Sequence, residues 1–220
     1  MKTHFSILIL IFSFLVTACK KDNTKTDYTN LYKKNNPNEI KYKVDTDKSI
    51  ILWTGFKPKV KHTGTLKLAE GVITLKNDSI VSGRFYFDLK SIAVTNLTEK
   101  EGKSKLEAHL KGIGDKAKSN DFFNILKFPS ADFKLIKVEY ENNKAIVYGN
   151  LSIKGITKAV NFPAEIKISN KEILIKSETL RLNRTYWDMK YASKKINPDL
   201  GLNYINDEVE VQVSVKADRI

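Results

Sequence analysis

Few residues of this 220-residue chain could act as a thiol nucleophile, as a proton carrier near neutral pH, or as a thiolate or imidazole metal ligand, since it has three His and one Cys. One Cys excludes an intrachain disulfide framework and any multi-cysteine zinc or iron–sulfur site. If His4 is removed with a signal segment, the two remaining His also exclude a three-His metal centre. His109 could form a dyad with Asp115 or Asp121, but the chain contains no Gly-x-Ser-x-Gly elbow, His-Glu-x-x-His pair, phosphate-binding loop or dinucleotide fingerprint. The sequence therefore predicts no enzyme, no metal site and no cofactor.

The single Cys fits a different chemistry, which is acylation. Lys2 precedes an apolar run over residues 5–16, which is too short to cross a bilayer but typical of a signal peptide. The run ends in Leu15-Val16-Thr17-Ala18-Cys19, which resembles the bacterial lipobox and implies transfer of a lipid to the Cys19 sulfur. We predict a lipoprotein-type signal peptide over 1–18, and a lipidated Cys19 with a flexible tether over 19–40. The alternative is an ordinary signal peptide with an incidental Cys.

These features predict a protein of the bacterial cell envelope, anchored to a membrane on its periplasmic face or at the cell surface. A lipidated Cys holds a chain on a leaflet because two or three acyl chains exceed the marginal affinity of a single one. The sequence leaves open whether the chain forms a homodimer.

The charge balance points toward lipid headgroups more than toward nucleic acid. The chain has 38 Lys and Arg against 25 Asp and Glu, a formal charge of +13. Only Arg84, Arg181, Arg184 and Arg219 are arginines, although bidentate recognition of phosphates and base edges favours Arg over Lys. We therefore predict no nucleic-acid binding, and a modest attraction of the many lysines to anionic headgroups.

From residue 41 onward the hydrophobic pattern is mostly of period two, which is typical of β-strands. The predicted strands lie at Ser49–Thr54, Gly71–Leu75, Arg84–Leu89, Asp132–Val138, Ala145–Ile153, Val160–Ile168, Glu172–Leu182 and Glu208–Lys216. Strands at this spacing, separated by Asn- and Lys-rich turns, favour an antiparallel barrel or sandwich. We predict a mainly β fold in one domain over residues 41–220.

One interval interrupts this rhythm. Between Thr98 and Lys118 the composition turns to Lys, Glu, Ala and Leu, which indicates a short helical excursion. The stretch Ser119–Leu126 has the pattern of an N-capped helical turn with an aromatic face.

Six stretches stand out in addition to the strand pattern. They are Val44–Ser49, Lys61–Gly64, Ser91–Thr95, Leu106–Leu110 with Asn120–Phe123 and Lys127–Pro129, Gly149–Lys158, and Asn183–Ser193. In this order they resemble the motifs of the YceI-like family, the lipid- or polyisoprenoid-binding domain of bacterial envelopes. The resemblance runs from Tyr42 to Ala217. It departs from the family pattern where an acid is displaced to Glu107 and where the segment from His109 to the Phe pair is longer.

The resemblance implies a lipocalin-like, extended antiparallel β-barrel of about eight strands, with an apolar cavity open at one end. The period-two strand pattern is consistent with such a barrel. An eight-stranded barrel can either fill with side chains or hold one slender ligand. The residues expected to line the cavity are Phe85, Phe87, Phe122, Phe123, Phe133, Phe162 and Trp187. The alternative for these aromatic side chains is that they simply fill the core.

Two side chains are candidates for contact with a ligand head group, His109 and Arg184. The alternatives are a surface or structural role for His109, and a structural ion pair between Arg184 and Asp188. Trp53 could pack in the core or mark the end of the barrel, and His62 is expected in a turn.

The function expected from the sequence is non-enzymatic binding or carriage of a long-chain isoprenoid or similar amphiphilic lipid, with Cys19 as the membrane anchor. The alternative is a structural or interaction lipoprotein with a filled barrel and no ligand. A hollow interior favours the first function, and an interior filled with side chains favours the second.

Overall fold

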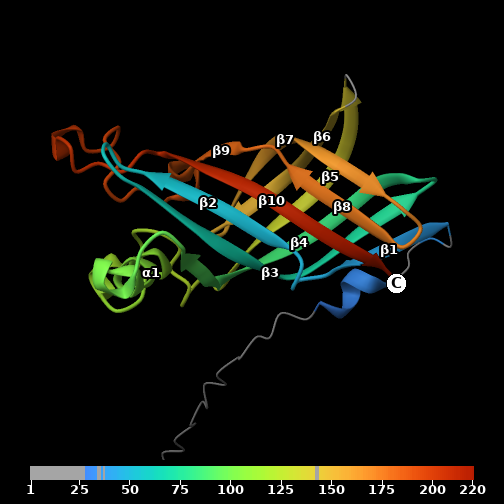
Figure 1. Cartoon of the computed structure of the whole chain (residues 1–220), viewed down its shortest axis with the longest axis horizontal. Helices are drawn as coiled ribbons and strands as arrows, with labels where there is room; N and C mark the ends of the chain where they lie inside the picture. The colour runs from blue at the N-terminus through green and yellow to red at the C-terminus, as the bar shows by residue number, and fades with distance from the viewer. Residues whose placement is uncertain (1–27, 34–35, 37, 142–143) are drawn as a thin grey trace, which may run out of the picture.

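The computed structural model describes residues 28–33, 36, 38–141 and 144–220. Within these ranges the chain forms one antiparallel sheet that closes into a barrel, with one α-helix and five short 3-10 helices (Figure 1). The elements are η1 (Thr29–Tyr32), β1 (Glu39–Val44), β2 (Ile50–Phe56), β3 (Lys61–Lys76), β4 (Ser79–Val94), η2 (Glu99–Glu101), α1 (Lys103–Lys111), η3 (Lys116–Lys118), β5 (Ser130–Glu141), β6 (Lys144–Ile153), β7 (Ile156–Ile168), β8 (Glu172–Ser177), β9 (Leu180–Asn183), η4 (Arg184–Trp187), η5 (Pro198–Leu200) and β10 (Glu208–Arg219).

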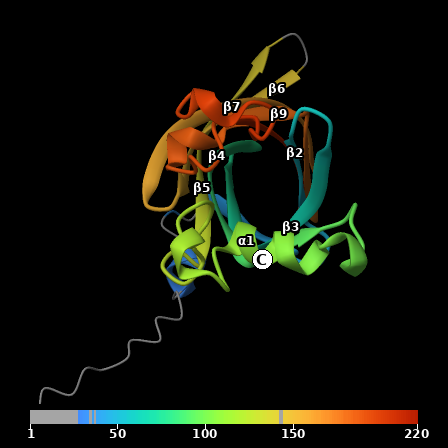
Figure 2. The same ribbon diagram turned by 90° about the vertical axis from the view of Figure 1, so that its left-hand side faces the viewer.

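The last strand closes the barrel. β10 pairs with β1 and β2 on one side and with β8 and β9 on the other, and the sheet runs without a break from β2 to β8. β1 and β2 both lie between β10 and β3, one after the other along the same line. β8 and β9 likewise follow one another along β10. The ten described strands therefore occupy eight positions around the barrel, which confirms the predicted barrel of about eight strands (Figure 2).

Two buried serines bridge the places where a strand position is interrupted. Between β1 and β2, the Oγ of Ser49 accepts a hydrogen bond from the Lys216 backbone nitrogen at 3.0 Å and donates to its carbonyl oxygen at 3.3 Å. Between β8 and β9, the Oγ of Ser177 accepts from the Val213 backbone nitrogen at 2.8 Å. The single strand predicted over Glu172–Leu182 is thus wrong in one respect, because it divides after Ser177. At both breaks a serine oxygen accepts a hydrogen bond from a backbone nitrogen of β10 that has no strand partner there.

The helical excursion is confirmed, although it is shorter than the interval that predicted it. α1 lies between Gly102 and Gly112, which are both in the left-handed region with φ of 90° and 70°. The predicted helical turn over Ser119–Leu126 is wrong, since the structure has bends and turns there. The backbone nitrogens of Phe123 and Ile125 donate instead to the carbonyls of Leu110 and Lys111, at 3.1 and 2.9 Å. This segment therefore satisfies carbonyl groups at the C-terminal end of α1 that have no partner within the helix.

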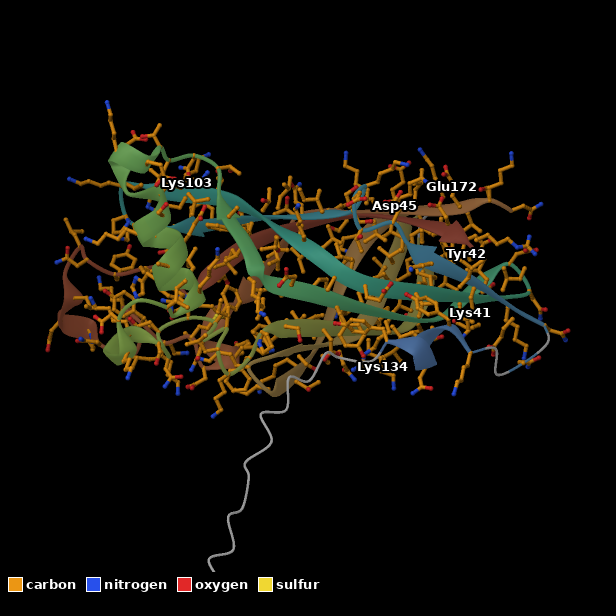
Figure 3. The ribbon with its side chains drawn as sticks, turned by 90° about the horizontal axis from the view of Figure 1, so that it is seen from below. Lys41, Tyr42, Asp45, Lys103, Lys134 and Glu172 are labelled. Carbon is orange, nitrogen blue, oxygen red and sulfur yellow. The ribbon has the colours of Figure 1, made fainter. Side chains whose placement is uncertain are left out.

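The described part of the predicted tether packs on the outside of the barrel. The ring of Tyr28 lies 4.8 Å from that of Tyr86 on β4, and the Lys41 ammonium donates to the Leu31 carbonyl at 2.8 Å. Figure 3 shows Lys41 on β1, near the short helix η1. Cys19 and the predicted signal peptide lie outside the described residues.

One end of the barrel is filled with side chains. Tyr42, Ile73, Leu75, Ile173 and Ala217 are at most 2% exposed and belong to one apolar cluster. The Tyr42 hydroxyl donates to the Ser169 carbonyl at 2.9 Å, so the polar atom of this large side chain is satisfied. The barrel is therefore closed at the end opposite α1.

Candidate functional site

A cavity of about 340 Å³ occupies the interior of the barrel between the filled end and α1. Its lining reaches Lys57 after β2, Leu110 in α1 and Tyr191 in the loop after η4, and it is open to solvent. These segments lie at one end of the barrel, toward the viewer in Figure 2. The site is therefore a hollow that is closed at one end of the barrel and open at the other.

The wall of the cavity is apolar because the strands place every second side chain inward. The row at positions 209, 211, 213 and 215 of β10 consists of Val alone, and all four line the cavity. Phe85, Phe87 and Leu89 of β4 contribute a second inward row. The lining thus follows directly from the period-two pattern of the sequence.

All seven aromatic residues expected at the cavity lie on its lining: Phe85, Phe87, Phe122, Phe123, Phe133, Phe162 and Trp187. The rings of Phe85, Phe133 and Phe162 form a row across the wall, with centroids 6.1 and 5.9 Å apart. Such tilted contacts between rings are favourable arrangements for aromatic pairs. The structure brings together side chains that are separated by more than 100 residues.

The two tryptophans direct their polar atoms away from the cavity space. The Nε1 of Trp187 donates to the Leu151 carbonyl at 3.2 Å, and the Nε1 of Trp53 donates to the Thr65 carbonyl at 3.3 Å. Both residues line the cavity, so the structure settles the position of Trp53 that the sequence left open. Their rings present apolar surface while their N–H groups are satisfied by the backbone.

His109 lies at the open end, on the face of α1 that lines the cavity. Its Nε2 is 2.7 Å from an Asp121 carboxylate oxygen. Its ring contacts those of Phe122 and Tyr191 edge-on, at centroid distances of 5.1 and 4.8 Å. Of the two acids considered for a dyad, Asp121 is the one in contact with His109. The arrangement joins α1, the following segment and the loop after η4 into one rim.

Arg184 is a buried cation at the cavity, with its side chain 3% exposed. Its guanidinium donates to the carbonyls of Met189, Ile205 and Asn206, and lies 3.3 Å from an Asp207 carboxylate oxygen. Burial lowers the pKa of Arg184 from its ordinary value, and the Asp207 charge opposes this effect. Arg184 therefore holds the loop between η4 and β10 in place from the inside.

The predicted ion pair between Arg184 and Asp188 is wrong. Asp188 follows η4 in the left-handed region, with φ of 58°, and its carboxylate pairs with Lys190 at 2.6 Å. The turn at Asp188 reverses the chain, so that Asp207 becomes the acidic partner of the buried guanidinium.

His62 is a functional candidate that sequence reasoning placed in a turn. It lies in β3 on the cavity lining, close to Lys57, and its Nδ1 is buried without a hydrogen-bond partner among the described residues. Burial, followed by the Lys57 charge, lowers the pKa of His62, while a hydrogen bond with Asn96 opposes the shift. The His62 ring thus places a buried nitrogen without a hydrogen-bond partner among the described residues beside the open end of the cavity.

Three further lining residues were not expected at the site: Leu106 and Leu110 of α1, and Tyr191. The two leucines stand four residues apart, so they share one face of α1. No pattern in the sequence indicated that this face would turn toward the barrel opening.

The described ranges lack two other kinds of feature. No group of three or more His, Cys, Asp or Glu side chains there is arranged to hold a metal ion. Likewise, no helix among the described residues is both long enough and apolar enough to cross a membrane.

Solved structures with a similar fold are a second line of evidence. BcnA of Burkholderia cenocepacia superposes with a TM-score of 0.61 at 19% identity, covering 79% of this chain and 99% of that chain. A polyisoprenoid-binding domain from Saccharophagus degradans superposes with a TM-score of 0.56 at 12% identity, covering 80% of this chain and 97% of that one. At these identities the likeness establishes the fold.

Sequence relatives point in the same direction. A UPF0312 protein of Photorhabdus laumondii is 30% identical over 110 residues, 50% of each chain. The YceI protein of Salmonella arizonae is 27% identical over 84 residues, 38% of this chain and 44% of that protein. The chain thus matches half or less of the length of these curated relatives. The profile of the YceI-like domain, in contrast, matches residues 42–217, nearly the whole barrel. The chain belongs to the YceI-like family.

Proposed function

We propose that this protein binds and carries a long-chain isoprenoid, or a similar amphiphilic lipid, in the cavity of its barrel. The observation that carries the proposal is an apolar hollow with one closed and one open end. A slender apolar chain fits such a space, with its tail toward the filled end and its polar head at the opening. The polyisoprenoid-binding domain from Saccharophagus degradans, which shares the fold, supports the same class of ligand.

The cavity must compete with a bilayer, in which the lipid tail is already out of water. Burial of a methylene group contributes about 0.8 kcal/mol relative to water, but much less relative to a membrane interior. Net capture therefore depends on the fit of the tail to the wall and on contacts to the head group. We include in the proposal a lipid anchor at Cys19, which would keep the barrel at a high effective concentration near its source of ligand.

We assign the head-group contact to Lys57 and His62. Of the polar groups at the opening, the His62 Nδ1 is the buried atom without a partner among the described residues, and Lys57 supplies a positive charge beside it. The other two candidates, His109 and Arg184, already bond to protein atoms. A hydroxyl, phosphate or carboxylate head group would satisfy the free nitrogen of His62.

A matched pair of substitutions in β10 tests the proposal. Val211 lines the cavity, whereas its neighbour Gln212 faces outward and is exposed. Full-length protein is purified from native membranes and extracted with organic solvent, and the extract is analysed by mass spectrometry. We expect a long-chain lipid from the wild type and from Gln212→Trp, but little or none from Val211→Trp, in which the indole occupies the hollow.

Repeated recovery of empty wild-type protein would contradict carriage. It would favour instead the alternative function, a structural or interaction lipoprotein of the envelope, which has the side-chain-filled end of the barrel in its favour.

A further inference from the structure

Three loops surround the opening of the cavity at the α1 end of the barrel. We call residues 57–60, 112–129 and 186–204 the mouth loops (Figure 1). They are joined by hydrogen bonds at their bases. The buried Lys154 ammonium donates to the carbonyls of Asn120 and Asp188 at 3.0 and 3.1 Å, and the Asn206 nitrogen donates to the Phe56 carbonyl at 2.9 Å. The mouth loops therefore form one connected rim.

The mouth loops expose large apolar side chains to solvent. The most exposed are Leu126 and Leu202, at 82% and 69%. The others are Val60, Ile113, Tyr186, Tyr191 and Ile196. Each of the three loops contributes at least one such residue. Exposed apolar groups gathered at one end of a protein indicate an interaction site more than isolated ones do.

The same loops carry an excess of positive charge. Their residues include eight lysines and four aspartates, with no Glu and no Arg. The two hairpin turns at the opposite end, Lys76–Ser79 and Ser169–Glu172, each contain one Lys and one acidic residue. The apolar and the basic side chains thus coincide at the opening of the cavity.

We infer that the mouth loops are a docking surface for an anionic lipid bilayer. This inference rests on the proposed function, since it supplies the route by which a lipid would enter the cavity without crossing water. Leu126 and Leu202 would enter the interfacial region, and Tyr186 would lie at the level of the headgroups, which Tyr prefers. The lysines would contact anionic headgroups, with their alkyl stems alongside the apolar side chains.

The arrangement suits a bilayer better than a protein partner. The apolar side chains project from three separate loops around an opening, whereas a protein interface of this kind is built around one continuous apolar core. A bilayer also accepts such loops without needing a shape that matches each of them. Contact with a bilayer leaves the opening facing the acyl chains that the cavity would receive.

The test uses an environment-sensitive fluorophore attached to single cysteines in the full chain. Cys19 is the only native Cys, so Cys19→Ala provides the background. The label is placed at Leu126→Cys or Leu202→Cys in the mouth loops, and at Tyr140→Cys as the control. Tyr140 is 64% exposed near the far end of β5. The probes are vesicles of phosphatidylcholine, with and without phosphatidylglycerol.

We expect blue-shifted, brighter emission at positions 126 and 202 with phosphatidylglycerol vesicles, and no change at 140. Replacing Lys194 and Lys195 together by Gln should lower the association constant roughly thirtyfold, because each Lys near an anionic surface strengthens binding about fivefold. Equal changes in emission at position 140 and at positions 126 and 202 would overturn the inference, as would no change at 126 and 202. A purified protein partner that shifts the emission at 126 and 202 where vesicles do not would overturn it too.

The outcome is separable from that of the proposed function. A Leu126→Ser, Leu202→Ser variant loaded with lipid in detergent should retain its lipid, yet acquire lipid from vesicles more slowly than the wild type. If this variant retains its lipid and also acquires lipid from vesicles as fast as the wild type does, the docking surface is refuted and carriage is not. Failure of the wild type to hold lipid at all refutes carriage.

Discussion

The ring of Phe133 on β5 lies over Gly149 on the neighbouring strand β6. A Cβ atom at position 149 would be 2.2 Å from the Phe133 Cζ and 2.6 Å from the Lys134 carbonyl oxygen. The missing side chain lets the ring extend across β6 to within 5.9 Å of the Phe162 ring. Gly149 is also the first residue of the stretch that matches the family pattern over ten residues. A glycine is needed at position 149 because the Phe133 ring, which forms part of the cavity wall, occupies the space of a side chain there.

We therefore expect Gly149→Ala to destabilise the fold by about 1–3 kcal/mol, since an added methyl group in a packed wall forces side chains and backbone to shift. Urea unfolding followed by tryptophan fluorescence measures the change. The matched control is Gly55→Ala, at a strand glycine that itself lines the cavity and whose Cβ would meet no atom within 4 Å. A similar loss of stability in both variants would contradict the role of the Phe133 ring.

The serine at the break between β8 and β9 offers a second test. Ser177→Ala removes the acceptor of the Val213 backbone nitrogen, and leaving a buried N–H unsatisfied costs about 1–3 kcal/mol. Hydrogen exchange should show faster exchange of the Val213 amide. Ser214→Ala, at an exposed position of β10, serves as the control. It should change neither the stability of the fold nor the exchange rate of the Val213 amide. Unchanged protection of Val213 in Ser177→Ala would refute the bridging role of the serine.

Arg184 and Arg181 provide a comparison between a buried and an exposed cation. Arg184→Lys keeps the charge but loses the fork that bonds several carbonyls, so we expect a destabilisation of about 2–4 kcal/mol. Arg181 pairs with Glu210 while its side chain is 68% exposed, and Arg181→Lys should change stability by less than about 0.5 kcal/mol. Denaturant unfolding of the two variants measures these changes in stability. Equal losses of stability would show that Arg184 does not organise the loop between η4 and β10.

The pKa of His62 predicts a dependence of stability on pH. Burial and the Lys57 charge lower this pKa in the folded state below the ordinary value of 6.5. As the pH falls through about 6.5, the unfolded chain takes up a proton that folded His62 resists, so the folded state loses stability. The loss continues until the pH reaches the folded pKa.

Urea unfolding at pH 7.5 and 5.5 measures this effect. The wild type should lose more stability between the two pH values than His62→Gln does. Lys57→Gln should fall between them, because it removes only the second cause of the shift. Identical pH dependences of the wild type and His62→Gln would exclude His62 as the titrating group.

Much of the cavity wall could be predicted from the sequence. Inward side chains in a barrel recur at every second position, so the alternation at Phe85 and Phe87, and along β10, specifies which residues share the inner face. The motif order indicated the family and, through it, an open apolar cavity. The strand break after Ser177 was missed although the inward positions change there from odd, at Ile173 and Ile175, to even, at Leu180 and Leu182. A side-chain hydrogen bond replaces the ladder at this point, and the sequence does not show that bond.

Local pattern determined most of the strands, the helix and the inward faces, because these depend on side-chain periodicity and turn residues within a few positions. Only the tertiary structure decided which polar groups meet at the opening. The pairs Arg184–Asp207 and His109–Asp121 depend on how turns reverse the chain, and the approach of Lys57 to His62 depends on the hairpin joining β2 and β3. The extent of the hollow was likewise undetermined, since it depends on how the inward side chains of all strands together fill the space enclosed by the sheet.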